Sequence, residues 1–149
     1  MDTGIKVGDL MTREPVTIDA GASLQQAAKL MADEHVGSLV IKKGGKLAGV
    51  ITEQDIVRKA VLKNLNAQNT HVSNIMETKL ITISPSEDIF KALKKMSESN
   101  IRHLPVMHKG EMVGFITIKD ILKVQPELFD LLQDKIEIRQ QEQRDYFAS

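Results

Sequence analysis

The chain contains neither cysteine nor tryptophan, and only 3% of its residues are aromatic. The lack of cysteine excludes disulfide bonds, thiolate metal sites and a cysteine nucleophile. Few aromatic side chains leave little for stacking on single-stranded nucleic acid. The balance of 20 basic against 20 acidic residues also gives no net charge to attract a phosphate backbone. The composition therefore disfavours thiol chemistry and nucleic acid as a partner.

Long apolar segments are missing as well. No apolar run approaches the roughly 18 residues of a membrane span, and the first residues lack the basic and then apolar pattern of a signal peptide. The chain also lacks a Gly-rich phosphate loop ending in Lys-Ser/Thr and a recognisable pair of nucleophile and base. These absences predict a cytoplasmic protein that contacts no membrane and is not an enzyme.

What the chain does contain is an internal repeat. Residues 7–56 align without a gap on residues 72–121, and 14 of the 50 aligned pairs are identical. Both copies close on a heptapeptide with Gly, Thr and Asp at the same positions, at 49–55 and 114–120. This repetition predicts two copies of one supersecondary unit related by a pseudo-two-fold axis. Since halves of roughly 60 residues are marginal alone, we expect them to share one core and to hold a ligand between them.

Each copy predicts the order β-α-β-β-α, which is an α/β (α+β) fold with a small sheet and two helices. A short β-rich stretch precedes a helix with an apolar stripe at i, i+3, i+4 and i+7, and two strands joined by a glycine turn follow. The ranges are 16–18, 24–31, 38–41 and 47–51 in the first copy and 81–83, 89–96, 104–107 and 112–116 in the second. Ser84, Pro85 and Glu87 predict the start of the second copy's helix, whereas Asp19 and Ser23 are both candidates in the first.

The same pattern predicts how the chain is divided. A first repeat at 1–63 is followed by a polar, Asn-rich linker at 64–71 and a second repeat at 72–125. Residues 126–149 are helical in character but lie outside the repeat, and they form a predicted C-terminal extension. This extension could pack on the repeats, join two chains or bind another protein.

The heptapeptide supports two interpretations, because it places Gly at the end of a strand and Thr at the start of a helix. In the structural one, Thr52 and Thr117 cap the helix while Asp55 and Asp120 complement its dipole. In the functional one, Gly lets a ligand approach the backbone, Thr and the helix N–H groups donate to phosphate, and Asp accepts from a neutral diol. Phosphate and diol together describe a ribonucleotide.

In this order and in duplicate, the motifs resemble a tandem pair of cystathionine-β-synthase (CBS) domains, a Bateman module, over about residues 5–125. The resemblance rests on the segments opening each copy at 7–12 and 72–76, the two heptapeptides, and the strand at 101–106. It implies a non-catalytic sensor that binds AMP, ADP or ATP in clefts between the repeats and signals to an unknown protein by conformational change. It implies neither a catalytic cofactor nor a metal. S-adenosylmethionine or NAD as ligand, and an adaptor for nucleic acid or protein without nucleotide sensing, are the alternatives.

The resemblance also implies residue roles. Asp55 and Asp120 would contact the ribose hydroxyls, and Thr52 and Thr117 would lie near phosphate. The adenine slot would be lined by Thr12, Pro15, Val16, Leu80 and Ile81. The other candidate ligand-binding residues are Val36, Gly37, Ile101, Arg102, His103 and Lys119.

The two copies differ most clearly before the second strand. Where the second copy has Ile101-Arg102-His103, the first has the neutral Val36-Gly37-Ser38. We therefore expect one tighter, phosphate-sensitive site and one weaker or empty site, although His103 is equally well explained as a packing residue. Finally, the resemblance implies a homodimer that packs through the second helices of the repeats, at 56–61 and 121–124.

Overall fold

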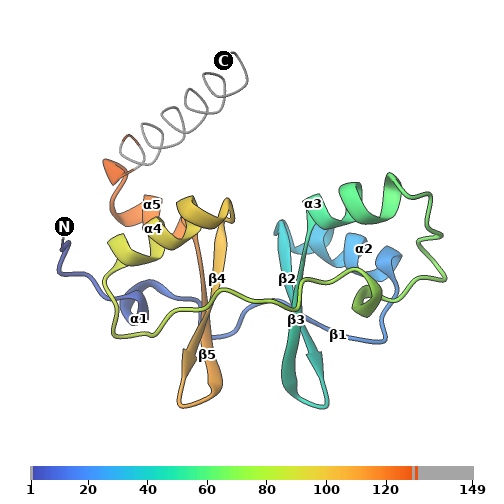
Figure 1. Ribbon diagram of the computed structural model, residues 1–149, viewed down its shortest axis with the longest axis horizontal. Helices are drawn as coiled ribbons and strands as arrows, with labels where there is room; N and C mark the ends of the chain where they lie inside the picture. Colours follow the sequence, from blue (N-terminus) through green and yellow to red (C-terminus); the bar gives the residue numbers. More distant parts are fainter. Residues whose placement is uncertain (1, 129, 131–149) are drawn as a thin grey trace, which may run out of the picture. The chain divides into compact units, whose positions relative to one another are not determined.

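The computed structural model describes residues 2–128 and 130 and divides into two compact units. One is formed by Glu14–Leu80 and is called here the 14–80 unit. The other, the 81–130 unit, combines the chain from Ile81 onward with the first 13 residues. Figure 1 shows a small sheet with helices in each unit. The sequence prediction of two small mixed units is therefore confirmed, whereas the predicted extension lies outside the described residues beyond Leu128, apart from Asp130.

The 14–80 unit is built on a three-stranded sheet in the order β1-β2-β3. β1 is parallel to β2, and β2 forms an antiparallel hairpin with β3, whose turn holds Gly44 and Gly45 at φ of +59° and +79°. A primed turn of this kind needs positive φ, which glycine adopts without strain. The elements are β1 (Thr17–Asp19), α2 (Leu24–Glu34), β2 (Ser38–Lys43), β3 (Lys46–Thr52), α3 (Glu53–Asp55), the π-helix η1 (Ile56–Val61) and the 3₁₀-helix η2 (Val72–Asn74).

The 81–130 unit has a two-stranded antiparallel sheet, β4-β5, in place of three strands. Its elements are α1 (Val7–Leu10), α4 (Ile89–Ser99), β4 (His103–His108), β5 (Glu111–Thr117) and α5 (Ile118–Val124). The predicted strand at 81–83 is reduced to a single parallel bridge between Ile83 and Val106. Pro105 explains this difference, because the corresponding residue in the other unit, Val40, donates its N–H to Val16 O at 3.1 Å, and proline has no N–H to donate.

The helices α2 and α4 start at corresponding positions of the repeat. Ser23 caps α2 by accepting from Gln26 N, with Gln26 returning the bond, so Ser23 and not Asp19 is the cap. Asp88 caps α4 by accepting from Phe90 N. The predicted start at Ser84 is wrong, because Ser84 to Glu87 form a turn closed by a 3.2 Å bond from Glu87 N to Ser84 O. Both helices bury the predicted apolar stripe, except that Ala28 is exposed.

The segment that opens each repeat packs in the unit of the other repeat. Val7 N donates to Glu87 O at 2.8 Å in the 81–130 unit, and Val72 N donates to Ala22 O at 2.8 Å in the 14–80 unit. The two bonds are equivalent, since a shift of 65 residues converts one donor into the other. Each compact unit therefore includes a stretch of chain that belongs, by sequence register, to the other repeat.

Candidate functional site

The segments that open the repeats and pack in the unit of the other repeat, residues 7–12 and 72–77, are called here the exchanged segments. The glycine of each heptapeptide lies under the exchanged segment of its unit. A Cβ on Gly49 would lie 2.7 Å from the sulfur of Met76 and 2.8 Å from Glu77 O, and one on Gly114 would lie 2.5 Å from the sulfur of Met11. The expectation that these glycines let a ligand approach the backbone is therefore replaced by a structural role. They let a neighbouring stretch of the same unit cross the strand.

The Thr and Asp of each heptapeptide form a reciprocal capping box. Thr52 N donates to Asp55 Oδ2 at 2.9 Å, and Asp55 N donates to the Thr52 hydroxyl at 3.1 Å. Thr117 and Asp120 repeat the arrangement at 2.9 and 3.3 Å. The structural interpretation is thus realised in both units, because each carboxylate satisfies a backbone donor at the helix start. It uses one oxygen of each carboxylate and leaves Oδ1 for another donor.

The second oxygen distinguishes the two aspartates. Asp55 Oδ1 lies 3.2 Å from the ammonium nitrogen of Lys59, one turn further along the chain. Asp120 Oδ1 has no ion pair or hydrogen bond within residues 2–128 and 130. Position 124, which corresponds to Lys59, is a valine that is 47% exposed. Asp120 is consequently the carboxylate with an acceptor available for a diol.

The residues that pack against the two helix starts differ in charge. In the 14–80 unit, Glu53 N donates to Gly37 O at 3.0 Å, and a Cβ on Gly37 would lie 3.4 Å from a carboxylate oxygen of Glu53. The same backbone bond in the 81–130 unit joins Ile118 N to Arg102 O at 2.9 Å. Arg102 and Lys119 are exposed, and the corresponding positions of the 14–80 unit, Gly37 and Gln54, are neutral.

His103 is part of an aromatic contact. Its ring stacks on Phe115 with centroids 5.7 Å apart and planes inclined by 16°. Cross-strand register explains the contact, because His103 pairs with Thr117 and Phe115 pairs with Pro105 on the adjoining strand. The packing explanation of His103 is therefore supported, and the stacked ring lies in the same unit as Arg102.

The residues predicted to line an adenine slot are divided between the units. Pro15, Val16 and Leu80 are half-buried in the 14–80 unit, while Thr12 and Ile81 are exposed in the 81–130 unit. Thr12 pairs with Phe115 through two backbone bonds of 2.8 and 2.9 Å. The hydrophobic residues preceding the second strands, Val36 and Ile101, are half-buried in their respective units. The role of these residues in adenine binding stays a prediction.

Two contacts of charged side chains in the 14–80 unit, those of Lys59 and Glu53, were not predicted from the sequence. Lys59 follows Asp55 by four residues, a spacing that brings side chains together on a helix and could have revealed the ion pair. Glu53 stands beside Gly37 only because the helix start packs against the beginning of β2, a long-range contact without a local signal. In the part of the chain that the structure describes, no cluster of three metal-binding side chains is found. Among the same residues, no helix is long and apolar enough to cross a membrane.

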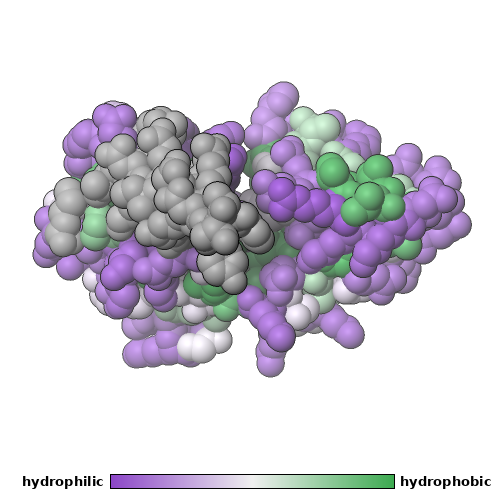
Figure 2. Space-filling view, turned by 45° about the horizontal axis from the view of Figure 1, so that its top comes forward, coloured by the Kyte–Doolittle hydropathy of each residue, from purple (hydrophilic) through white to green (hydrophobic). Residues whose placement is uncertain are grey.

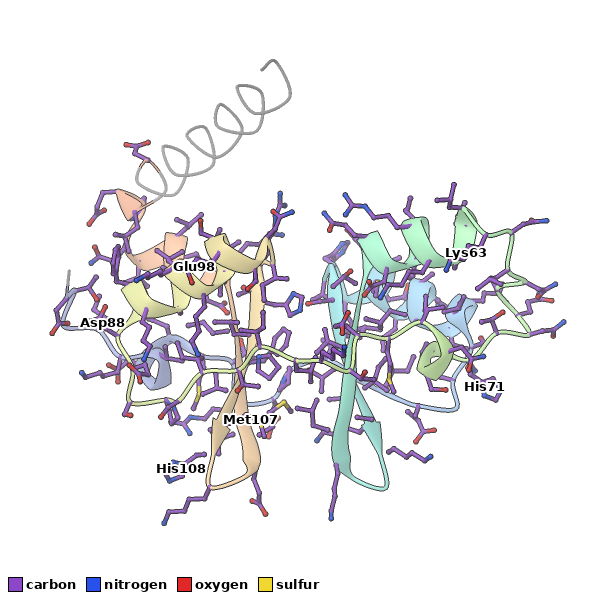
Figure 3. The ribbon with its side chains drawn as sticks, viewed as in Figure 1. Lys63, His71, Asp88, Glu98, Met107 and His108 are labelled. Carbon is purple, nitrogen blue, oxygen red and sulfur yellow. The ribbon has the colours of Figure 1, made fainter. Side chains whose placement is uncertain are left out.

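Side chains outside the capping boxes divide into surface and anchoring residues. His71 and His108 are exposed, and Figure 3 draws both at the periphery of their units. Asp88, labelled in the same view, holds the start of the chain by accepting from Thr3 N and Gly4 N, each at 3.0 Å. Burial raises the pKa of the Asp88 carboxyl, but hydrogen bonds with Asp2, Phe90, Thr3 and Gly4 outweigh it and lower the pKa to about 2.

Comparison with known proteins identifies the class. A family model of the CBS domain matches residues 7–62 and 72–127. The mitochondrial CBS domain-containing protein CBSX3 of Arabidopsis thaliana is 37% identical over 106 residues, which make up 68% of this chain and 52% of CBSX3. This chain thus spans about half the length of that relative.

Solved structures agree with this assignment. A putative signal-transduction protein with CBS domains from Burkholderia ambifaria superimposes with a TM-score of 0.72 at 35% identity, covering 74% of this chain and 82% of that one. The CBS domain pair of protein MJ0100, in complex with 5′-methylthioadenosine and S-adenosyl-L-methionine, gives a TM-score of 0.73 at 30% identity, covering 83% and 97%. The chain belongs to the CBS domain family and carries two such domains, which confirms the resemblance seen in the sequence.

Proposed function

We propose that this protein is a non-catalytic sensor that binds an adenosine-containing ligand and changes conformation so that a protein partner responds. The observation that supports it best is the oxygen of Asp120 that the capping box does not use, in a unit that also carries the exposed cations Arg102 and Lys119. A carboxylate suits the two hydroxyls of ribose, and the cations suit phosphate. That MJ0100 was solved with two adenosine compounds gives this chemistry a precedent among similar proteins.

AMP, ADP and ATP are the ligands that we favour, because Arg102 and Lys119 carry charge that an uncharged nucleoside would not use. S-adenosylmethionine and NAD share adenine and ribose with them and are the second candidates. The MJ0100 complex favours S-adenosylmethionine, whereas the two cations near Asp120 favour a phosphorylated ligand. The ligand's 5′ group therefore decides between the candidates.

Two measurements test the proposal. Mass spectrometry of small molecules released on denaturing the purified protein should find an adenosine compound, and calorimetry should show that the protein binds it again. Asp120→Asn should weaken binding by about 1.5–3 kcal/mol, because the charged acceptor is lost while the amide oxygen can still cap the helix. Unchanged affinity in Asp120→Asn would remove the ribose role from Asp120. Turnover of ATP by the clean protein would instead indicate an enzyme.

We further propose a homodimer formed through the second helix of each repeat. Val57, Val61 and Leu62 are 59%, 68% and 79% exposed on and just after η1, and a hydrophobic patch is visible on this unit in Figure 2. Apolar side chains gathered on one surface favour an interface. Light scattering at tens of micromolar should therefore give a dimer, and Val61→Asp should shift it to monomer. Truncation after Gln125 tests whether the remaining residues contribute, and a monomeric full-length chain would refute the dimer.

A further inference from the structure

Lys59 is held by three oxygens of the 14–80 unit. Its ammonium nitrogen lies 3.2 Å from Asp55 Oδ1 and donates to Ile75 O at 3.2 Å. A carboxylate oxygen of Glu77 lies 3.9 Å away and adds a second negative charge. The side chain of Asp55 is only 16% exposed, against 37% for that of Lys59. The ion pair is therefore partly shielded from water. Its attraction is screened less than that of a fully exposed ion pair.

The anchors of Lys59 belong to the exchanged segment. Ile75 and Glu77 flank Met76, which covers Gly49, and Glu77 pairs with Val50 through backbone bonds of 2.9 and 3.1 Å. Because this segment is tied to β3, the Ile75 carbonyl that accepts from Lys59 is fixed by the backbone of the unit, whereas the Glu77 carboxylate is on a side chain that is 52% exposed. The ammonium group is consequently positioned on Asp55 by its surroundings and not by the flexible side chain alone.

The corresponding place in the 81–130 unit has no such cation. Val124 stands where Lys59 does, Thr12 where Glu77 does, and Asp120 Oδ1 accepts from no residue in the described part of the chain. The capping bonds of Asp55 and Asp120 are otherwise alike. The two carboxylates thus differ in the one oxygen that the helix start does not use.

We infer that Lys59 determines which carboxylate accepts ribose: it occupies Asp55 and leaves Asp120 as the primary acceptor. The inference rests on the proposed binding of an adenosine compound. A ribose hydroxyl is a neutral donor, and a charged ammonium donor competes with it successfully for the same oxygen. The carboxylate charge that would strengthen a hydroxyl hydrogen bond is also partly neutralised by the ammonium. Ribose therefore binds less tightly at Asp55 than at Asp120 as long as Lys59 stays in place.

Calorimetry with adenosine tests this inference without interference from phosphate. In the Asp120→Asn background the main ribose acceptor is weakened, so the remaining binding reports Asp55. Adding Lys59→Met, which keeps the length of the side chain and removes its charge, should tighten this binding about tenfold, or about 1.4 kcal/mol. Lys63→Met in the same background is the matched control, because Lys63 is exposed, follows Lys59 by one turn and forms no ion pair among the described residues (Figure 3).

The outcomes distinguish failure of this inference from failure of the proposed function on which it rests. Tighter adenosine binding with Lys59→Met and unchanged binding with Lys63→Met support the inference. Unchanged binding with Lys59→Met overturns it, and weaker binding overturns it by making Lys59 a ligand contact. If neither the variants nor the wild-type protein bind adenosine, AMP, ADP, ATP, S-adenosylmethionine or NAD, the proposed function itself fails and the inference with it. Thermal melting of each variant shows whether it is folded, and we expect little change for a half-exposed ion pair.

Discussion

In both units a threonine caps the helix that follows the sheet and an aspartate returns the hydrogen bond, yet the charges around these boxes differ. In the 14–80 unit Asp55 pairs with Lys59, and Glu53 lies beside Gly37. In the 81–130 unit the exposed cations Arg102 and Lys119 stand at the positions of the neutral Gly37 and Gln54. The features that the units share are explained by folding, because each unit needs a capped helix and a glycine over which the exchanged segment can cross the strand. What distinguishes them lies next to the carboxylates. The differences that bear on the proposed ligand binding therefore lie in side chains that the common backbone does not require.

The largest expected effect is a loss of stability on substitution of Gly49 or Gly114, the glycines that the exchanged segments cover. A Cβ at Gly49 would meet the backbone oxygen of Glu77 at 2.8 Å, whereas at Gly114 the nearest backbone oxygen, that of Thr12, is 3.1 Å away. Flexible methionine side chains can move aside, but a backbone held by two hydrogen bonds cannot. Gly49→Ala should therefore lower the free energy of unfolding by about 3 kcal/mol and Gly114→Ala by about 1–2 kcal/mol.

Urea denaturation measures both losses, and Gly37→Ala is the control. A Cβ at Gly37 would meet only the flexible carboxylate of Glu53, at 3.4 Å, so its unfolding free energy should change little. Equal losses of unfolding free energy in Gly49→Ala and Gly37→Ala would show that the exchanged segment does not exclude a side chain at Gly49.

The next effect concerns the charge that distinguishes the second copy. Arg102→Ala should weaken AMP and ATP by about 1.5–3 kcal/mol and adenosine hardly at all, because the guanidinium would face phosphate. Lys109, exposed in the turn between β4 and β5, is a matched position for the control Lys109→Ala. Calorimetry with the three ligands checks this, and a uniform loss across them would mean that Arg102 supports the fold instead.

A smaller effect is the difference in unfolding free energy lost when Asp55 or Asp120 is replaced. Removing the cap by Asp120→Ala should cost about 1 kcal/mol of unfolding free energy. Asp55→Ala also breaks the ion pair with Lys59, which adds about 0.5 kcal/mol for a partly exposed pair. In the Lys59→Met background the excess should vanish, and an excess that persists would show that the ion pair contributes nothing to stability.

The sequence predicts those features that repeat locally. The hairpins follow from glycine turns, and the boxes at Thr52 and Thr117 follow from a spacing that occurs twice. The start of α4 was misassigned because Ser84, Pro85 and Glu87 imitate a capping box, although Asp88 is the residue that aligns with Ser23. The internal repeat alone does not decide between them, because Asp19, the other candidate in the first copy, aligns with Ser84.

Other features depend on contacts between distant residues. That Met76 covers Gly49 and Met11 covers Gly114 could not be predicted, because nothing in either methionine's neighbourhood specifies which repeat it joins. Pro105 offered a readable signal, since a proline inside a strand pattern removes a hydrogen bond to its neighbour. The contact of Glu53 with Gly37 had no such signal. The candidate ribose carboxylates were therefore predictable, but the charges that make them unequal were only partly so.

The smallest expected effect is a difference in pH dependence between the capping residues of α2 and α4. Asp88 ionises with a pKa of about 2 in the folded chain against a usual value of 3.8, whereas Ser23 does not titrate. The contribution of Asp88 to stability is therefore fully present above pH 3.8 and is lost as the pH falls through 2. Because water screens this carboxylate, we expect less than about 1 kcal/mol. The unfolding free energy of the wild-type protein should exceed that of Asp88→Asn at pH 6, and the excess should shrink between pH 4 and pH 2.

Ser23→Ala provides the matched control, since its cost should be the same at every pH at which the protein stays folded. An Asp88→Asn difference that is constant from pH 6 to pH 2 would contradict the lowered pKa. Protection of the Thr3 and Gly4 amides from hydrogen exchange gives an independent reading, because both N–H groups donate to Asp88. This protection should fall as Asp88 is protonated. The amide of Val72, whose bond to Ala22 involves no titrating group, should keep its protection over the same range.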